Sequence, residues 1–225
     1  MDLAQTMSAQ TPISNVVIYG NSPKFITIIN ALFPKANTTL LPWRTSESEA
    51  AMTLVKSPIP ADLLVLCGYD YDSYSETENR YLDHNVYRIL AVCKMITNDA
   101  TRIIYIDTLS TNKGWTYSRY LYAKKLLGQE LKITFPQTQA LPIPTVFDQQ
   151  RQIGIQGGML SQFAAKALIH LGIIRTIDLE QLQDRIEDSI QSPGNRLDSS
   201  PMIRPILINI PRSQLIDRAL RILLG

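Results

Sequence analysis

The sequence predicts an α/β protein with a doubly wound, mostly parallel sheet and a small helical C-terminal extension. Two observations lead to this fold class. Apolar runs of strand length alternate with longer segments in which apolar residues recur at helical spacing, as expected for βαβ units. Some of these runs, such as residues 62–67, are almost entirely apolar, which is typical of parallel strands buried on both faces.

The first part of the chain is predicted to contain three strands and two helices. The first strand is followed by a helix that Pro34 ends, and the short second strand ends at Pro42. The predicted strands are residues 15–19, 38–41 and 62–67, and the predicted helices are residues 25–33 and 47–56.

A long helix is predicted next, followed by a second pair of strand and helix. Residues 102–106 read as a strand, residues 115–127 as a helix and residues 131–135 as a further strand. Pro136, Pro142 and Pro144 predict a loop beyond that strand. The long helix covers residues 76–97 and places Leu82, Val86, Ile89, Leu90, Cys93 and Ile96 on one side.

The C-terminal part is predicted to be mainly helical. Asp178 is the expected N-cap of an amphipathic helix, and Gly172 is expected to end the helix before it. The predicted helices are residues 157–171, 178–190 and 213–224, with a turn-rich connection at 191–201 and a strand at 202–210. We therefore expect a flexible segment at residues 1–14, a doubly wound domain at 15–175 and an extension at 176–225 packed on it.

Composition limits the classes of function. Of the 225 residues, 45% are hydrophobic and 19% are charged, which supports a sizeable core, and a net charge of +2 without a basic run argues against nucleic acid. The chain has no long apolar stretch and no signal-peptide pattern at its start, so we expect a cytoplasmic protein outside the membrane. Cys67 and Cys93 lie in apolar runs and predict buried free thiols. His84 and His170 lack metal-ligating neighbours, so no metal is expected.

A tyrosine and a lysine one helical turn apart are the strongest chemical signal. Tyr120 and Lys124 fall on one face of the predicted helix. An ammonium beside a phenol lowers the pKa of that phenol, so the pair suits proton transfer at a carbonyl or carbinol carbon. The strand before this helix ends in hydroxyl residues, Thr108 and Ser110.

Four short motifs follow one another along the middle of the chain. Residues 62–68 form an apolar strand ending in glycine, and Asn85 begins a helical Asn-Val pair. Residues 104–108 form a strand that ends in threonine, and Tyr120 with Lys124 makes a Tyr-x-x-x-Lys motif. In this order they resemble the short-chain dehydrogenase/reductase family, in its extended, nucleotide-sugar-modifying branch. The resemblance implies a Rossmann-like fold, NAD or NADP as cofactor and a nucleotide-sugar-like small molecule as substrate.

The resemblance also implies a role for each matching residue. Tyr120 would be the general acid/base at the substrate oxygen, and Lys124 would lower its pKa and bind a cofactor ribose hydroxyl. Thr108, or Ser110 nearby, would be the hydroxyl partner, and Asn85 would support the lysine through a water. From the residues alone, Thr108 also fits an ordinary strand-end hydroxyl and Asn85 a buried amide satisfied by backbone.

The end of the first strand departs from the family pattern. Of the glycines that approach a pyrophosphate, only Gly20 is present, because Pro23 and Ile26 stand about where the other two belong. Proline removes an N–H that could bind phosphate. Asn21 and Ser22 are the remaining candidates to contact an anion there.

Two further positions are candidates for cofactor binding. Arg44 follows the second strand and is compatible with the 2′-phosphate of NADP, although it also fits a solvated surface arginine. Gly68 ends the third predicted strand. It begins a tyrosine-rich loop, residues 68–76, at the edge of the sheet where ligands of open α/β folds bind.

These patterns leave alternatives from different classes. The motifs favour an NAD(P)-dependent epimerase, dehydratase or reductase. The degenerate glycine motif instead favours a pseudoenzyme, a non-catalytic Rossmann-fold subunit for binding or scaffolding that has lost its cofactor. A nucleotide-binding transferase on a similar sheet would explain the alternation alone. The family pairs protomers through its long helices, here residues 76–97 and 115–127, which implies a homodimer or a heteromer.

Overall fold

The computed structural model describes residues 12–46, 49–50, 60–108, 119–143, 145–146 and 176–191. Several predicted elements therefore lie outside the described residues. These are most of the helix at 47–56, the helix at 157–171, the connection at 191–201, and the strand and helix at 202–210 and 213–224.

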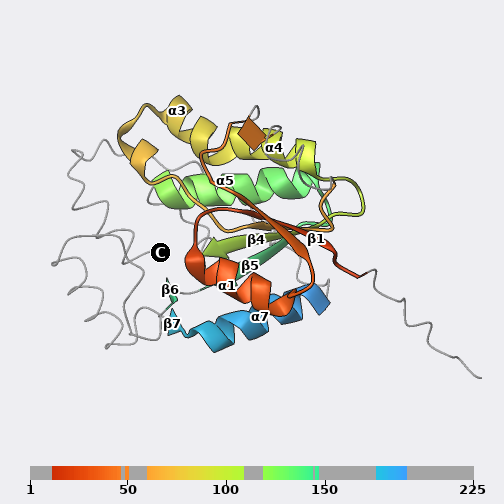
Figure 1. Cartoon of the computed structure of the whole chain (residues 1–225). Helices are drawn as coiled ribbons and strands as arrows, with labels where there is room; N and C mark the ends of the chain where they lie inside the picture. The colour runs from red at the N-terminus through yellow and green to blue at the C-terminus, as the bar shows by residue number, and fades with distance from the viewer. Residues whose placement is uncertain are drawn as a thin grey trace, which may run out of the picture.

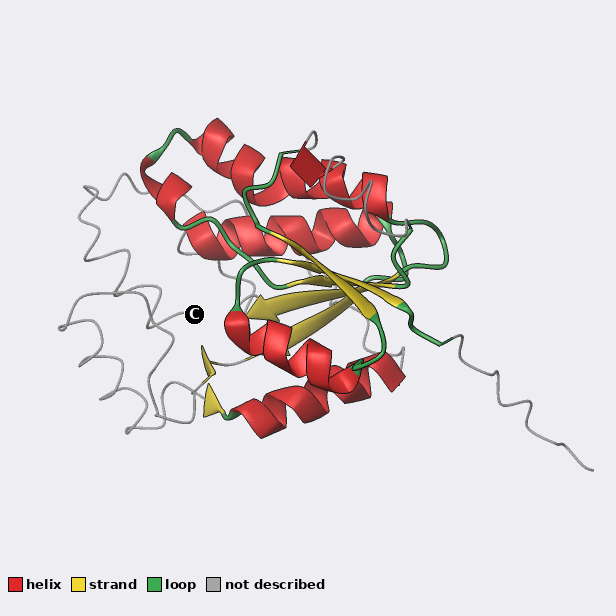
Figure 2. Ribbon diagram, viewed as in Figure 1, coloured by secondary structure: helices red, strands yellow, loops and turns green. Residues whose placement is uncertain are grey.

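Five parallel strands form one sheet with the order β2-β1-β3-β4-β5 (Figures 1 and 2). The chain starts in the interior of the sheet and then builds it in both directions, so β1 and β3 are neighbours whose connections diverge. This is the topological switch point of an open α/β sheet. The strands are β1 (Asn15–Tyr19), β2 (Asn37–Leu41), β3 (Leu63–Leu66), β4 (Arg102–Thr108) and β5 (Gln139–Ile143). The doubly wound fold class is thereby confirmed.

Helices cover both faces of the sheet, as Figure 2 shows. One face carries α1 (Pro23–Leu32) and α7 (Leu179–Gln191), which contact each other. The other face carries α3 (Glu78–Leu82), α4 (Arg88–Ile96) and α5 (Arg119–Thr134). A short 3₁₀ turn, η1 (Asp72–Ser75), precedes α3, and a small parallel pair lies apart from the main sheet, β6 (Thr145–Val146) with β7 (Thr176–Ile177).

The sheet has a hydrophobic core on each face because side chains alternate along each strand. In β3, Leu64 and Leu66 pack under α4 and α5, whereas Leu63 and Val65 pack under α1 and α7. All four are buried, which explains why the strand reads as a continuous apolar run.

The predicted long helix is confirmed in its buried face and differs in its geometry. All six of the apolar residues named above for that face are buried. The helix is not uniform, however, because a π turn, η2 (Asp83–Tyr87), joins α3 to α4. Such single π turns are frequent at functional sites. This one contains the candidate residue Asn85.

The strand predicted at residues 131–135 is wrong. Residues 131–134 are the last turn of α5, where Leu127 and Leu131 both reach the core four residues apart. The next strand is β5, in the stretch predicted as a loop. Pro142 is accommodated because β5 stands at the end of the described sheet, where a missing N–H does not interrupt a ladder.

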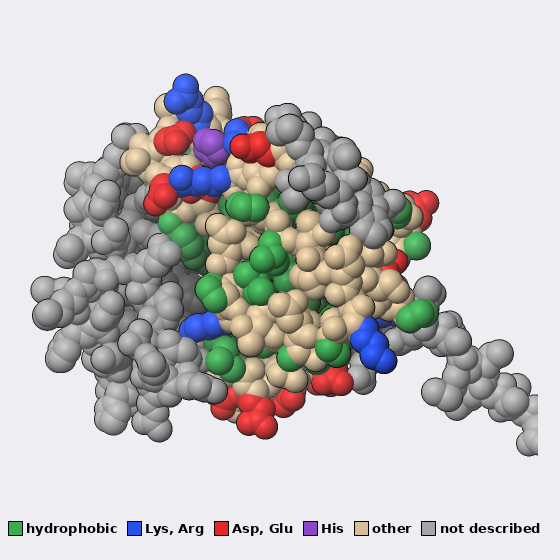
Figure 3. All heavy atoms as spheres, in the orientation of Figure 1, with side chains coloured by type: hydrophobic (Ala, Val, Ile, Leu, Met, Phe, Trp, Pro, Cys, Tyr) green, Lys and Arg blue, Asp and Glu red, His purple; other side chains and the backbone are tan. Residues whose placement is uncertain are grey.

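The starts of α1 and α7, which share one face of the sheet, follow the residues found there. α1 starts two residues earlier than predicted because Pro23 takes the first helical positions, which suit its fixed φ. Asp178 caps α7 as predicted. Its Oδ1 accepts from Gln181 N at 2.8 Å, and Gln181 Oε1 accepts from Asp178 N at 3.3 Å. Acidic side chains cover the outer face of α7 (Figure 3).

Candidate functional site

Parallel strands bring the predicted site residues to one edge of the sheet. Gly20 follows β1, Arg44 follows β2, Gly68 follows β3, and Thr108 ends β4. Carboxyl ends of parallel strands meet at the same edge, which is where open α/β folds bind ligands. Ser110 lies outside the described residues.

Lys124 is buried on α5 against the end of β4. Lys124 is only 6% exposed, and its Nζ donates to Ile106 O at 2.9 Å. The ammonium lies 4.9 Å from the ring centre of Tyr105 and 5.9 Å from that of Tyr69. Burial lowers the pKa of Lys124 to about 8, against the opposing negative charge of Asp107. A buried lysine with a perturbed pKa at the ligand edge of a sheet is a functional-site signal.

Tyr120 lies in a group of aromatic rings, the tyrosine cluster, formed by Tyr69, Tyr71, Tyr81 and Tyr120. The ring of Tyr120 meets Tyr69 edge-on at 4.7 Å and stacks on Tyr71 at 5.9 Å. The hydroxyls of Tyr69 and Tyr81 share a short hydrogen bond. The cluster joins the loop after β3 to α3 and α5. The tyrosine-rich loop at residues 68–76 was the signal for it in the sequence.

The pKa of Tyr120 is raised, which corrects the expectation from the pair alone. Burial is the main cause, followed by the phenol of Tyr71 and the carboxylate of Asp107. The sequence argument considered only the ammonium of Lys124, whereas the folded environment removes the phenol from water. Burial therefore favours the protonated phenol of Tyr120 and makes it a weaker acid.

Thr108 closes β4 beside a carboxylate that the sequence analysis did not single out. Asp107 is buried, and its Oδ1 accepts from Thr108 N at 2.7 Å. Asp107 also acts on its surroundings, because its charge raises the pKa of Lys124 and of Tyr120. Asp107 lies in the motif at residues 104–108, directly before Thr108.

Asn85 is a hydrogen-bonding centre for the loop after β3. Its Oδ1 accepts from Asp70 N at 2.8 Å and from Trp43 Nε1 at 3.3 Å. Its Nδ2 lies within hydrogen-bonding distance of Asp70 O, Ser73 Oγ and Tyr81 O at 3.1–3.2 Å. These contacts match a buried amide satisfied largely by backbone. Support of Lys124 through a water stays a prediction.

The turn after β1 packs closely against the loop after β3. Gly20 has φ +145°, and a Cβ on it would lie 2.5 Å from Gly68 N. Neither position accepts a side chain without movement. Ser22 precedes α1 but makes no side-chain capping bond, and Asn21 is exposed. The N–H that Pro23 lacks would have been one of those pointing out of the helix start.

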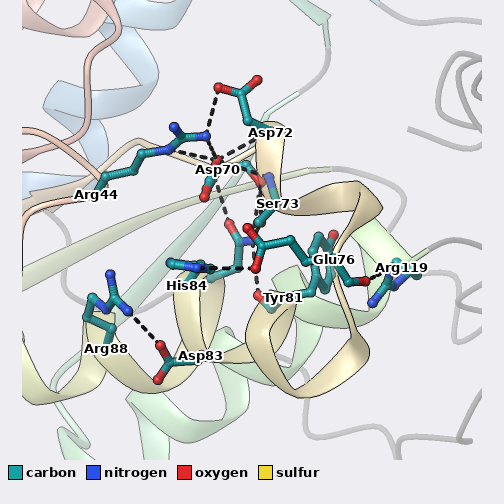
Figure 4. A network of polar contacts seen from close by, with 11 residues as sticks. Arg44, Asp70, Asp72, Ser73, Glu76, Tyr81, Asp83, His84, Arg88 and Arg119 are labelled. Carbon is teal, nitrogen blue, oxygen red and sulfur yellow. Dashed lines mark hydrogen bonds and ion pairs between the residues drawn. The ribbon is translucent and has the colours of Figure 1, made fainter.

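Arg44 is engaged by two carboxylates (Figure 4). Its Nη2 lies 2.5 Å from Asp70 Oδ1 and 2.7 Å from Asp72 Oδ2, and its Nε donates to Asp70 Oδ1 at 3.0 Å. Although burial by itself raises the pKa of Asp70, Arg44 and two backbone N–H groups bring it below the ordinary value. A 2′-phosphate at this position would meet two negative charges, so the arrangement does not favour NADP.

The residues around Gly68 do not fit a dinucleotide in this conformation. Trp43 is 3% exposed, and its indole lies against Gly68, where a Cβ would be 2.7 Å from Cδ2. Glycine allows another group to approach closely, and here that group is the side chain of Trp43.

Within the described residues, no helix is long and apolar enough to cross a bilayer, and no cluster of metal-ligating side chains is found.

Comparisons with known proteins identify solved structures with a similar fold. No protein-family model and no curated protein sequence matches the chain. Among solved structures, dTDP-4-dehydrorhamnose reductase from Bacillus anthracis str. Ames, in complex with NADP, is 13% identical with a TM-score of 0.58, over 82% of this chain and 73% of that chain. A GDP-L-fucose synthetase from Naegleria fowleri bound to NADP is 10% identical with a TM-score of 0.54, over 81% and 71%.

A third solved structure also has a similar fold. It is a short-chain dehydrogenase/reductase superfamily protein from Agrobacterium tumefaciens with bound NAD, 12% identical with a TM-score of 0.54, over 77% of this chain and 72% of that chain. These likenesses agree with the resemblance that the sequence motifs predicted, and at such identities they establish the fold. The chain has a Rossmann-like α/β fold, which it shares with these three structures.

Proposed function

We propose that this chain is an epimerase/dehydratase- or reductase-like protein that acts at a carbonyl or carbinol carbon of a nucleotide-sugar-like small molecule. The observation that carries the proposal is the buried ammonium of Lys124, held on Ile106 O one helical turn beyond Tyr120. Burying a lysine is unfavourable unless its charge is used or compensated. Here it lies at the edge of the sheet where ligands bind.

The proton chemistry follows from the environments of the three side chains. Tyr120 is protonated and would donate to the substrate oxygen as negative charge develops on it. Lys124 remains mostly cationic at neutral pH and would stabilise the resulting phenolate. Thr108 would hydrogen-bond the same oxygen. The resemblance implies NAD or NADP as the hydride carrier, but the residues around Gly68 do not accommodate one as they stand, so only proton transfer is assigned.

The residues that follow β2 favour a second candidate function. Trp43 covers Gly68, and Arg44 is engaged by Asp70 and Asp72. These contacts support a non-catalytic Rossmann-fold subunit that has lost cofactor binding and serves in binding or scaffolding. Association as a homodimer or heteromer through the long helices, as the resemblance implies, would cover the exposed side chains of Tyr87 and Met95.

Cofactor binding and turnover separate the two candidates. Calorimetric titration of the purified protein with NAD(H) and NADP(H), followed by assays on dTDP- and GDP-linked sugars, tests the first. Tyr120→Phe should abolish turnover and leave binding nearly unchanged, because only the hydroxyl is removed. Tyr122→Phe, on the same helix, is the matched control and should remain active. Full activity in Tyr120→Phe would refute its role, and absence of both binding and turnover at millimolar cofactor would favour the non-catalytic subunit.

A further inference from the structure

The switch point of the sheet is closed by backbone and side-chain contacts. The strand ends stay paired beyond the regular sheet, because Gly20 N donates to Leu41 O at 2.8 Å and Cys67 N donates to Tyr19 O at 3.0 Å. The glycines that follow β1 and β3 then lie against each other. A ligand therefore cannot enter between the two glycines and would have to lie over them, outside the strand ends.

Trp43 occupies that space. It comes two residues after β2 and lies over the end of β3 on Gly68, with its ring 5.3 Å from that of Tyr19 at the end of β1. Its indole N–H donates to Asn85 Oδ1 at 3.3 Å, so the polar atom of the ring is also satisfied. The indole therefore takes up room at the switch point, which is where open α/β sheets bind nucleotides.

The segment that carries Trp43 is fixed to the loop after β3 at two points. The adjacent Arg44 pairs with Asp70, and Asn85 accepts from both the indole N–H and Asp70 N. Asp70 in turn accepts from Asp72 N at 3.0 Å. Moving the indole together with its segment therefore requires breaking a connected set of hydrogen bonds, of which those to Asn85 are buried, and this is more costly than rotating an isolated side chain.

We propose that Trp43 is a specificity-determining residue whose indole occupies the base-binding part of the switch-point crevice, so that a dinucleotide binds only when the indole has left Gly68. The inference rests on the proposed function for the location of the site, but it concerns binding and not catalysis. It implies that the chain excludes NAD and NADP unless the Trp43 segment moves. A ligand that leaves Trp43 in place must be smaller and lie on the Tyr120 side.

The first test enlarges the crevice. Trp43→Leu removes the indole, and calorimetric titration of the full chain with NAD⁺ and NADP⁺ should show at least a tenfold gain in affinity over the parent. Trp43→Phe keeps a ring in the core and should give a smaller gain in the same direction. Phe33→Leu, which removes an aromatic ring at the C-terminal end of α1, is the control and should bind as the parent does. Thermal unfolding confirms that each variant is folded, and a folded Trp43 variant that binds no better than the parent overturns the proposal.

The second test needs no change in the core. The chain has two tryptophans, so Trp115→Phe leaves Trp43 as the sole reporter. Any dinucleotide binding should shift its emission to longer wavelength and increase its quenching by acrylamide, and binding with unchanged emission would overturn the proposal. Binding by Trp43→Leu without turnover of any sugar tested would leave this inference standing and remove the proposed function, so the two failures are distinguishable.

Discussion

On the β4–α5 side of the ligand edge, ionisable groups are buried with perturbed pKa values, whereas on the β1–β2 side the chain satisfies and covers its own groups. Lys124 and Tyr120 are held away from water, and Asp107 lies close enough to act on both. Trp43 and Arg44, in contrast, are paired with Asn85 and with carboxylates. Two sides of one sheet edge thus treat their polar groups differently: one buries them away from water, and the other pairs and covers them.

The largest expected loss of stability comes from substitutions on the β1 side, at Gly20 and Gly68. Gly20→Ala should lower the free energy of unfolding by about 4 kcal/mol, because a positive φ and a clash with backbone both force movement. In Gly68→Ala the nearest obstacle is the ring of Trp43, although Gly20 Cα also lies 2.9 Å from the added Cβ. Trp43→Leu should therefore rescue Gly68→Ala in part and leave Gly20→Ala unrescued. Urea unfolding of the single and double variants measures this. A loss below about 1 kcal/mol in Gly20→Ala would show that the turn is not constrained.

The next largest effect is expected on the β4–α5 side, at Lys124. The pKa of Lys124 is about 8 in the folded chain, below its ordinary value of 10.5. Between these pH values the folded chain releases a proton that the unfolded chain keeps, so wild type should gain stability relative to Lys124→Met as pH rises. The gain is about 3 kcal/mol over this window. Chemical denaturation at several pH values measures it, with exposed Lys94→Met as the control, and a pH-independent difference would exclude the buried charge.

A smaller effect tests the residue that connects the two sides. Asn85→Ala leaves Trp43 Nε1 and Asp70 N without their acceptor, which should lower stability by about 2 kcal/mol. It should also increase acrylamide quenching of Trp43 in the Trp115→Phe background. Asn79→Ala, at an exposed position of α3, is the matched control. Unchanged stability together with lost turnover would instead assign Asn85 to the lysine.

Sequence pattern was sufficient wherever burial repeats with a regular period. β1 was predicted with its observed bounds, and the buried face of the long helix was predicted residue by residue. The sequence pattern gave wrong predictions between residues 131 and 143. The β-branched and aromatic residues at the end of α5 resembled a strand, and Pro142 led to the prediction of a loop where β5 lies. Local propensity is weak there, and the position at the end of the sheet decides which conformation is tolerated.

The sequence by itself determined the doubly wound fold, the order of the four motifs and the presence of Tyr120 and Lys124 on one helix, because these depend on spacing along the chain. Only the tertiary structure decided that burial raises the pKa of Tyr120 and that Trp43 packs on Gly68. Both depend on which distant segments meet at the ligand edge. Desolvation and packing are set by those contacts, and no local spacing in the chain encodes them.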